Sequence, residues 1–470
     1  MDIMFRQERF SESRKDDSMA EQADMRMAAL DTLMAVDKGE RRLDQAVSDV
    51  LVQNQFAPRR DRAFYRRICE GVTERKIYLD YVIDHYSSRP VRKCKPLIRS
   101  LLRMSAYQIL FMDVRDAAAC NEAVKIAKKR HFRNLSGFVN GLLRTISREK
   151  ENLPVPDRAK NCEEYYSVMY SMPAWIVRLL LKQYGEEETG IILKAMEETS
   201  PLSIRVNENK ITKEELTKKL ELEGVTVTPG EYSPHALRLS GVDFLEKLPS
   251  FREGDYLVQD ESSMLVAEIA GVKKQDQILD LCSAPGGKTF DCAQMAREGH
   301  VTARDLTEYK TDLLMENKDR LGFTNVTVEC RDATEFDQES EKAMDLVIAD
   351  LPCSGLGVMG RKNDIRYNLS EDQLASLVKL QRQILTNAWR YVKPGGTLIY
   401  STCTLNREEN QVNAAWIEDN TPLKLDSIEE DLPEKLRGRT GKQGYLQLVP
   451  GKDSCDGFFL AKFKRPLEDS

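Results

Sequence analysis

Hydrophobic and polar residues follow two different periods along this chain, and the pattern changes twice between the two ends. From residue 23 to 150 apolar residues recur at spacings of three and four, which is typical of amphipathic helices packed around a core. One such stripe contains Met27, Leu30, Leu33 and Met34. The sequence therefore predicts an all-α domain over residues 23–150.

Residues 151–270 show no single period and predict a linker followed by a small α+β subdomain. Pro154 and Pro156 favour a linker over the first part of this stretch. The segment 202–206 alternates like a strand, and the charged segment 211–222 is predicted to be a helix with Thr212 as its N-cap. A further helix over residues 175–184 and short strands over 237–239 and 256–258 are also expected.

From residue 271 to 466 short apolar runs alternate with helical patterns. The predicted strands are 278–281, 300–303, 326–329, 345–349 and 397–401. The predicted helices are 288–297, 310–321, 371–392 and 408–419. Strands that alternate with helices predict a doubly wound α/β domain, in which ligands bind beyond the carboxyl ends of the strands.

The first strand of this domain runs into a glycine turn and a helix over the stretch from Ile278 to Thr289. Such a unit is typical of nucleotide-type sites, because missing side chains let a cofactor approach the backbone and the helix start offers free N–H groups. A P-loop would need glycine at the position of Cys282, and the Rossmann glycine spacing is absent. An ordinary turn between strand and helix is the remaining alternative.

Acidic and thiol side chains follow the predicted strands: Asp305, Asp332, Asp350, Cys353 and Cys403. Parallel strands bring these positions to one edge of the sheet. An acid at the end of the second strand typically binds ribose hydroxyls, and an ionised cysteine is a potent nucleophile. Two cysteines could form and then break one covalent bond. The competing interpretation is that the acids cap helices and the cysteines are small buried side chains.

Composition and charge narrow the class of protein. The 470 residues are 41% hydrophobic and 31% charged, and no apolar run is long enough for a membrane span. Residues 1–22 lack a signal-type apolar core and are expected to form a disordered tail, with Met19 as an alternative start. The ten cysteines show no zinc-type spacing, so we expect no metal. Without a long apolar run we expect no membrane association. Without an export signal we expect a reducing cytoplasmic location with free thiols.

Positive charge is concentrated in the helical domain. Residues 58–150 contain 22 Lys or Arg and 9 Asp or Glu, a local charge of +13, whereas the whole chain carries −6. A basic module on an acidic chain favours a polyanionic partner, and a solvated basic surface without a ligand is the alternative.

The helical domain resembles the NusB-like RNA-binding domain. The resemblance rests on Asp61–Phe64 with Gly71-Val72, on Leu101–Tyr107, on Asn121–Lys128 and on Phe138–Leu143. It implies that a basic helical surface contacts RNA.

The last two hundred or so residues resemble the RNA (cytosine-5) methyltransferases. Cys282–Lys288, with the sequence CSAPGGK, is similar to their S-adenosylmethionine loop. Asp350–Gly355 is similar to their Pro-Cys motif, and Tyr400–Thr404 with Glu408–Asn410 to their Thr-Cys motif. Asp456–Phe459 resembles their closing strand. Together with the NusB-like part, the whole chain resembles the bacterial RsmB (Sun, Fmu) family.

This resemblance implies S-adenosylmethionine as cofactor. The residues implied to bind it are Cys282, Ser283, Ala284, Pro285, Gly286, Gly287, Lys288, Asp305, Asp332 and Asp350. Within this set, the family pattern assigns the ribose to Asp305 and the adenine amine to Asp332.

The resemblance also implies a covalent mechanism at cytosine 967 of 16S ribosomal RNA. Cys403 adds to C6 of the base, Cys353 assists release, Asp350 steadies the activated ring, and Lys288 lies near cofactor and base. The chemistry agrees independently, since cytosine C5 is a poor nucleophile until a group such as a thiolate adds at C6. The base must also leave its stack to enter such a site.

Two other functions are compatible with parts of the sequence. In a DNA cytosine-5 methyltransferase, Cys353 rather than Cys403 would attack the base. An RNA-binding assembly factor would keep the cofactor fold without catalysis. We expect a monomer that acts on small-subunit ribosomal RNA, either naked or in an early assembly intermediate.

Overall fold

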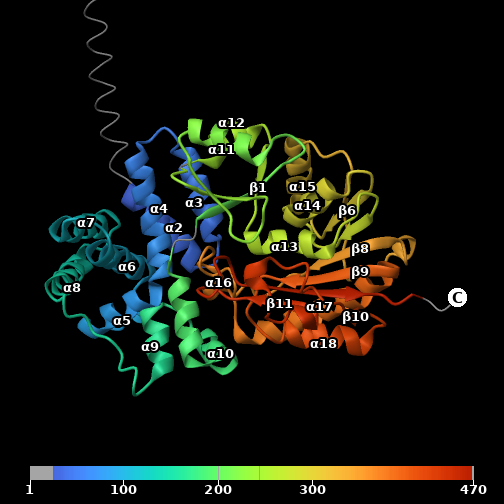
Figure 1. Ribbon diagram of the computed structural model, residues 1–470. Helices are drawn as coiled ribbons and strands as arrows, with labels where there is room; N and C mark the ends of the chain where they lie inside the picture. The colour runs from blue at the N-terminus through green and yellow to red at the C-terminus, as the bar shows by residue number, and fades with distance from the viewer. Residues whose placement is uncertain (1–24, 199–200, 243, 468–470) are drawn as a thin grey trace, which may run out of the picture. The chain divides into compact units, whose positions relative to one another are not determined.

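A computed structural model describes residues 25–198, 201–242 and 244–467 (Figure 1). The predicted tail over residues 1–22 and the alternative start at Met19 lie outside these ranges. The chain divides into two compact units. The helical unit extends to Leu181 and includes the later segment Lys362–Asn368, and the sheet unit consists of Lys182–Arg361 and Leu369 onward.

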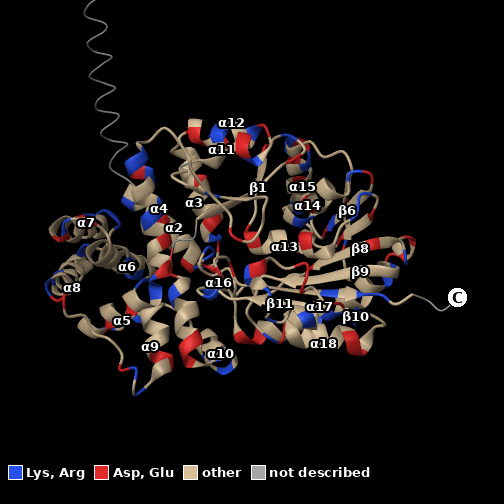
Figure 2. Ribbon diagram, in the orientation of Figure 1, with Lys and Arg blue, Asp and Glu red and all other residues tan. Residues whose placement is uncertain are grey.

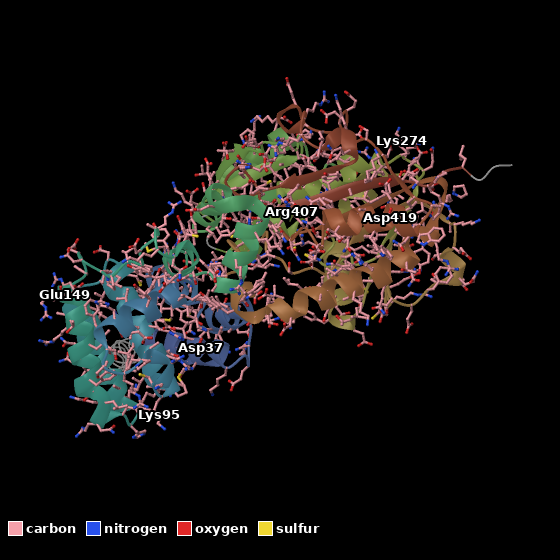
Figure 3. All side chains as sticks on the ribbon, turned by 90° about the horizontal axis from the view of Figure 1, so that it is seen from below. Asp37, Lys95, Glu149, Lys274, Arg407 and Asp419 are labelled. Atoms are coloured by element: carbon pink, nitrogen blue, oxygen red, sulfur yellow. The ribbon has the colours of Figure 1, made fainter. Side chains whose placement is uncertain are left out.

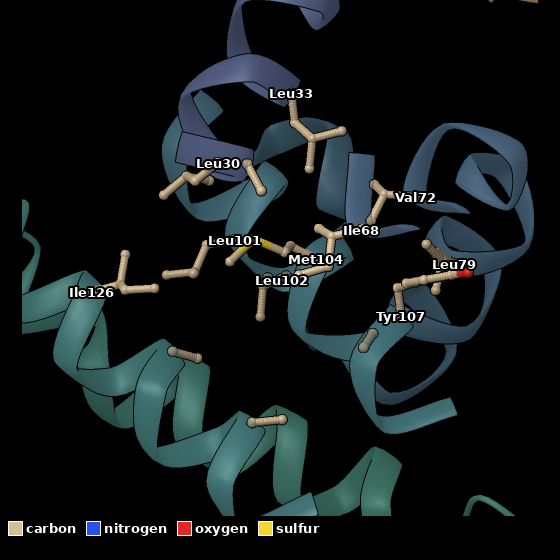
Figure 4. Close-up of a cluster of buried hydrophobic side chains, with 14 of the residues drawn as sticks. Leu30, Leu33, Ile68, Val72, Leu79, Leu101, Leu102, Met104, Tyr107 and Ile126 are labelled. Carbon is tan, nitrogen blue, oxygen red and sulfur yellow. The ribbon is translucent and has the colours of Figure 1, made fainter. Parts of the chain in front are cut away.

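The helical unit confirms the predicted all-α domain. Its helices are α2 (Met25–Asp37), α3 (Leu43–Gln53), α4 (Arg59–Glu74), α5 (Lys76–Tyr86), α6 (Pro96–Phe111), α7 (Asp116–Lys129), α8 (Ser136–Arg148), α9 (Cys162–Met169) and the short α16 (Ile365–Asn368). Helix α6 is buried over most of its length, and Leu101, Leu102 and Met104 lie among side chains of the surrounding helices, such as Leu30 and Ile68 (Figure 4). The apolar stripes therefore form one core.

A buried charge cluster lies beside this core. Arg103 on α6 donates to Asp37 and Asp80, at 2.6 Å each, and only 6% of its surface is exposed. The segment that returns to this unit packs nearby, because Tyr367 donates to the Ser171 carbonyl at 3.0 Å and the Lys76 ammonium lies 4.9 Å from the Tyr367 ring. A stretch shortly after the Pro-Cys motif is thus built into the helical unit.

The sheet unit begins with the second half of α10 (Ala174–Ala195), which is broken at Gly185, where φ is +79°. A four-stranded antiparallel sheet follows with the order β2-β3-β1-β4. Its elements are β1 (Leu202–Val206), α11 (Lys213–Leu222), β2 (Thr226–Pro229), β3 (Ala236–Ser240), α12 (Pro249–Arg252) and β4 (Tyr256–Val258). Thr212 is the N-cap of α11, as predicted, and it forms a capping box with Glu215. This confirms the small α+β subdomain.

An eight-stranded sheet forms the rest of the unit, with the order β10-β12-β9-β8-β5-β6-β7 and with β11 paired to β12. Strands β5 to β9 are parallel, and β12 runs antiparallel to β9. The strands are β5 (Gln277–Asp280), β6 (His300–Asp305), β7 (Val326–Cys330), β8 (Met344–Asp350), β9 (Val392–Thr402), β10 (Lys424–Leu425), β11 (Tyr445–Leu448) and β12 (Phe458–Lys464).

Helices cover both faces of this sheet (Figure 1). One face carries α13 (Glu261–Ala270), α14 (Gly287–Met295) and α15 (Glu308–Leu321), and the other carries α17 (Glu371–Tyr391) and α18 (Gln411–Asn420). Neighbouring residues of β5 serve the two faces: Ile278 packs with the first group and Leu279 with the second. Because both faces are covered, the central strands β5 and β8 contain buried apolar runs over residues 278–279 and 346–349. This arrangement confirms the doubly wound α/β domain.

Element boundaries differ from the prediction at one point that matters for the site. The helix predicted over residues 408–419 begins only at Gln411, because Glu408, Glu409 and Asn410 form turns and Glu409 points inward. Helix α13 was not predicted. The domain limits at residues 150 and 270 stay predictions. No helix within the described ranges is long and apolar enough to span a membrane.

Candidate active site

Three adjacent parallel strands bring the candidate loops together. Strand β8 lies between β5 and β9, with Ile348 opposite Asp280 and with Asp350 opposite Ser401. The glycine loop follows β5, the Pro-Cys loop follows β8, and the Thr-Cys loop follows β9. The three segments therefore leave the sheet at the same edge, as the alternation of strands and helices indicated.

The two candidate cysteines meet at this edge. The Sγ atoms of Cys353 and Cys403 are 3.4 Å apart, and both side chains are half-buried. The Gly357 N–H donates to the Cys403 carbonyl at 3.0 Å, which fixes the Pro-Cys loop against the Thr-Cys loop. The hydrogen bond to Cys403, burial and the charge of Glu409 raise the pKa of Cys353 well above its usual range. A raised pKa favours the neutral thiol form of Cys353.

Lys288 and Asp350 form an ion pair next to the cysteines. The Lys288 ammonium lies 2.7 Å from Asp350 Oδ2 and 3.1 Å from Ser263 Oγ, and Ser401 Oγ donates to Asp350 Oδ1 at 2.8 Å. Burial would lower the pKa of Lys288, but the charges of Asp350 and Cys403 outweigh it and raise this pKa. The structure thus keeps a cation beside Asp350 and Cys403.

The glycine loop has the backbone that close approach of a ligand requires. Gly286 has φ +107°, and a Cβ built there would lie 2.2 Å from the Phe290 ring, so other residues would be strained. Gly287 opens α14 directly after it. The Ser283 hydroxyl donates to the Asp280 and Arg304 carbonyls at 2.8 and 2.9 Å, which ties the loop to β5 and β6.

Asp305 reaches this loop from β6. Its Oδ2 accepts from the Ala284 N–H at 3.0 Å, and its Oδ1 accepts from the Leu306 N–H at 2.7 Å and from Lys310 Nζ at 2.9 Å. Arg304 points elsewhere and pairs with Glu329. Two backbone donors and Lys310 thus hold this carboxylate against the glycine loop.

Asp332 lies two residues beyond Cys330, the β7 residue opposite Asp305. Its Oδ1 accepts from the N–H and the hydroxyl of Thr334, at 2.8 and 2.7 Å, so in this structure it caps a turn. Burial, together with the charge of Asp305, raises the pKa of Cys282, which leaves a neutral thiol in the loop. The predicted cofactor-binding residues thus lie on neighbouring segments.

The residues at this edge fit a nucleoside cofactor. Asp280 Oδ1 is buried and has no hydrogen-bond partner within the described part of the chain. Burial raises the pKa of Asp280 to about 7, and Thr289 donates to its other oxygen at 2.7 Å. An orphaned acceptor behind a glycine loop suits a ligand that donates hydrogen bonds. No cluster of potential metal ligands occurs in the described ranges.

Two contributors were not identified from the sequence. Ser263 lies on α13, an element without a motif, and no sequence signal pointed to its contact with Lys288. In the sequence Glu409 stands out only as part of a motif, yet its carboxylate is fully buried and touches both cysteine loops. The Glu-Glu-Asn spacing after Cys403 was the signal that could have found it.

Comparison with known proteins agrees with this architecture. The family model for 16S rRNA methyltransferase RsmB/F matches residues 267–464, the NusB family model matches 23–148, and the model for the ferredoxin-like domain of RsmF/B-like methyltransferases matches 172–243. The crystal structure of PH0851 is 26% identical with a TM-score of 0.79, covering 93% of this chain and 98% of that one. A methyltransferase homolog protein from Pyrococcus horikoshii is 26% identical with a TM-score of 0.56, covering 65% and 99%.

Curated relatives extend over nearly the whole chain. The probable ribosomal RNA small subunit methyltransferase B of Bacillus subtilis is 35% identical, covering 94% of this chain and 98% of its own length. The ribosomal RNA small subunit methyltransferase B of Vibrio cholerae is 31% identical, covering 89% and 93%. Because these relatives, the three matched domains and the loop geometry agree, the chain belongs to the RsmB/F family of S-adenosylmethionine-dependent 16S ribosomal RNA methyltransferases.

Proposed function

We propose that this protein methylates C5 of a cytosine in 16S ribosomal RNA through a covalent bond between Cys403 and C6, with cytosine 967 as the target. The observation that carries the proposal is the contact between the sulfurs of Cys353 and Cys403, which lie 3.4 Å apart beside the Lys288–Asp350 ion pair. This arrangement favours one thiolate and one thiol.

The Cys403 thiolate is the nucleophile of the first step. Its addition to C6 makes C5 electron-rich, and S-adenosylmethionine supplies the methyl group that C5 takes. The C5 proton then passes to solvent, and the electron pair of that C–H bond restores the C5–C6 double bond as Cys403 leaves C6 as a thiolate. We assign Cys353 to assist this release. Asp350, held by Lys288 and Ser401, steadies the activated ring. The positive charge of Lys288 favours the thiolate form of a neighbouring cysteine.

The cofactor would be held by the loop Cys282–Lys288 and by the acids behind it. We assign the ribose to Asp305 and the adenine amine to Asp332, with Asp350 between cofactor and base. The contact between Asp305 and the Ala284 N–H supports the first assignment.

RNA would bind the helical unit through its basic surface. Arg59, Arg60, Arg66 and Arg67 on α4 are all exposed, and Figure 2 shows basic residues on this helix. Exposed cations of this kind bind phosphates without regard to sequence. We further propose a cytoplasmic monomer that acts on naked RNA or on an early assembly intermediate, with domains over residues 23–150, 151–270 and 271–466.

Methyl transfer to 16S RNA, followed by bisulfite sequencing, tests the proposal. The wild type should protect cytosine 967 from conversion, and Cys403→Ala should not. Cys330→Ser is the matched control, because Cys330 is exposed at the end of β7 and away from the paired sulfurs. Protection of another cytosine would contradict the target. Full activity of Cys403→Ala would contradict the assignment of Cys403 as the nucleophile.

A further inference from the structure

Glu409 is a fully buried carboxylate at the junction of the two cysteine loops. Its Oε2 accepts from the Ser354 N–H at 2.9 Å and from Gln381 Nε2 at 3.0 Å. Its Oε1 accepts from the Ser354 hydroxyl at 2.5 Å and from Asn406 Nδ2 at 3.1 Å. All four partners are donors, and a carboxylate can accept hydrogen bonds through both of its oxygens. Within the described ranges no lysine or arginine forms an ion pair with it.

These hydrogen bonds tie the two cysteine loops to one point. Ser354 is the residue after Cys353, and Asn406 is three residues after Cys403. The Ser354 and Thr404 hydroxyls also contact each other at 2.6 Å. The distance between the two sulfurs is therefore set by a clamp whose centre is the Glu409 side chain.

The charges around the two cysteines are asymmetric. The titratable groups that face Cys353 are Cys403, Glu409 and the buried phenol of Tyr400. On the side of Cys403 lies the Lys288 ammonium, which also faces the carboxyls of Asp350 and Asp280. A negative charge disfavours a second anion nearby, and a positive charge favours one.

We propose that Glu409 is a positioning residue that keeps the proton on Cys353 and leaves the thiolate to Cys403. This rests on the proposed function, which gives the two sulfurs different tasks. When the pair loses one proton to solvent, the proton leaves Cys403 Sγ, and the remaining one stays on Cys353 Sγ and is donated to Cys403. The hydrogen bonds of Glu409 go to Ser354, Gln381 and Asn406, so it acts through the two loops.

Initial rates of alkylation test this inference on the full-length protein without RNA or cofactor. Iodoacetamide is added at a series of pH values, and the peptides that contain Cys353 and Cys403 are quantified by mass spectrometry at low conversion. In the wild type, Cys403 should react at lower pH than Cys353. In Glu409→Gln, alkylation of Cys353 near neutral pH should rise about tenfold, since only the thiolate reacts. The matched control Glu408→Gln removes the same charge from an exposed neighbour and should change nothing.

The shape of the pH profile separates charge from loosened packing. Loss of the Glu409 charge lowers the pH at which the alkylation rate of Cys353 increases, and it leaves the rate at high pH unchanged. If Glu409 had only a structural role, its replacement would raise the alkylation rate at high pH. The pH at which the rate increases would stay unchanged. Ser354→Ala, which weakens the clamp but keeps the charge, should leave the rise where the wild type has it.

An unshifted Cys353 profile in Glu409→Gln would overturn the inference. If that variant does not fold, the wild-type alkylation profiles still test the inference. A Cys353 that ionises at lower pH than Cys403 would contradict it. Since the assay contains no RNA, its failure is distinct from failure of the proposed methyl transfer, which is read from the RNA.

Discussion

The Lys288 ammonium lies 2.7 Å from the carboxylate of Asp350, and the charge of an ionised Cys403 raises the pKa of the same ammonium. Lys288 follows the glycine loop, Asp350 ends β8, and Cys403 follows β9. One cation thus connects the segments proposed to hold cofactor, base and nucleophile. The ordering of strands β5, β8 and β9 makes this possible, because it places the three segments side by side.

Replacing Lys288 by methionine should abolish most of the activity. The variant leaves Asp350 without its partner and removes the cation that favours a Cys403 thiolate, so kcat should fall on the order of 10²-fold. Steady-state methyl transfer to 16S RNA measures this. Lys274→Met is the control, because Lys274 is an exposed lysine of the same unit (Figure 3) and should retain wild-type kcat. An unchanged kcat in Lys288→Met would contradict the role of the cation.

Asp280 should make the stability of the sheet unit depend on pH. Burial raises its pKa from 3.8 to about 7, so the folded protein binds the proton more tightly than the unfolded chain. Stability from this group is therefore full at low pH and is lost as the pH rises from 3.8 to about 7.

The variant Asp280→Asn removes this dependence and can still accept from Thr289. Relative to the wild type, its free energy of unfolding should increase by a few kcal/mol between pH 5 and pH 8. Denaturant unfolding at the two pH values measures the difference, with exposed Asp312→Asn as control. A difference that does not change with pH would show that Asp280 is ionised in the folded protein throughout.

Gly286 should be required for cofactor binding. An alanine there would need φ +107° and would place its Cβ against the Phe290 ring, so the loop must shift. We expect Gly286→Ala to bind S-adenosylmethionine at least about tenfold more weakly by calorimetry, since the backbone no longer fits the ligand. Gly137→Ala, at an uncrowded helical position, should bind normally. Equal affinity of the two variants would argue against contact between cofactor and loop.

Much of the fold followed from local patterns. Short apolar runs predicted strands β5 to β9, and a threonine ahead of a charged helical pattern predicted Thr212 as the cap of α11. The start of α18 was missed because Glu409 has the propensity of a helix residue but lies buried in a turn before it. Helix propensity is a local property, so it does not predict a contact with a loop that is distant in the sequence.

The site was predictable as a set of residues but not as a network. Motif spacing and the sheet rule placed Asp350, Cys353 and Cys403 at one edge. The contact of Ser263 with Lys288, and the packing of Tyr367 in the helical unit, join residues far apart in the sequence. Such long-range contacts depend on the whole fold and leave no local pattern. The chemical roles of the site residues stay predictions.

A covalent trapping assay distinguishes the roles of Cys353 and Cys403. Wild type, Cys353→Ala and Cys403→Ala are incubated with S-adenosylmethionine and 16S RNA and then separated on a denaturing gel. The account predicts a stable protein–RNA adduct with Cys353→Ala, which forms the bond but does not release it, and none with Cys403→Ala. An adduct with Cys403→Ala and none with Cys353→Ala would exchange the two roles and contradict the account.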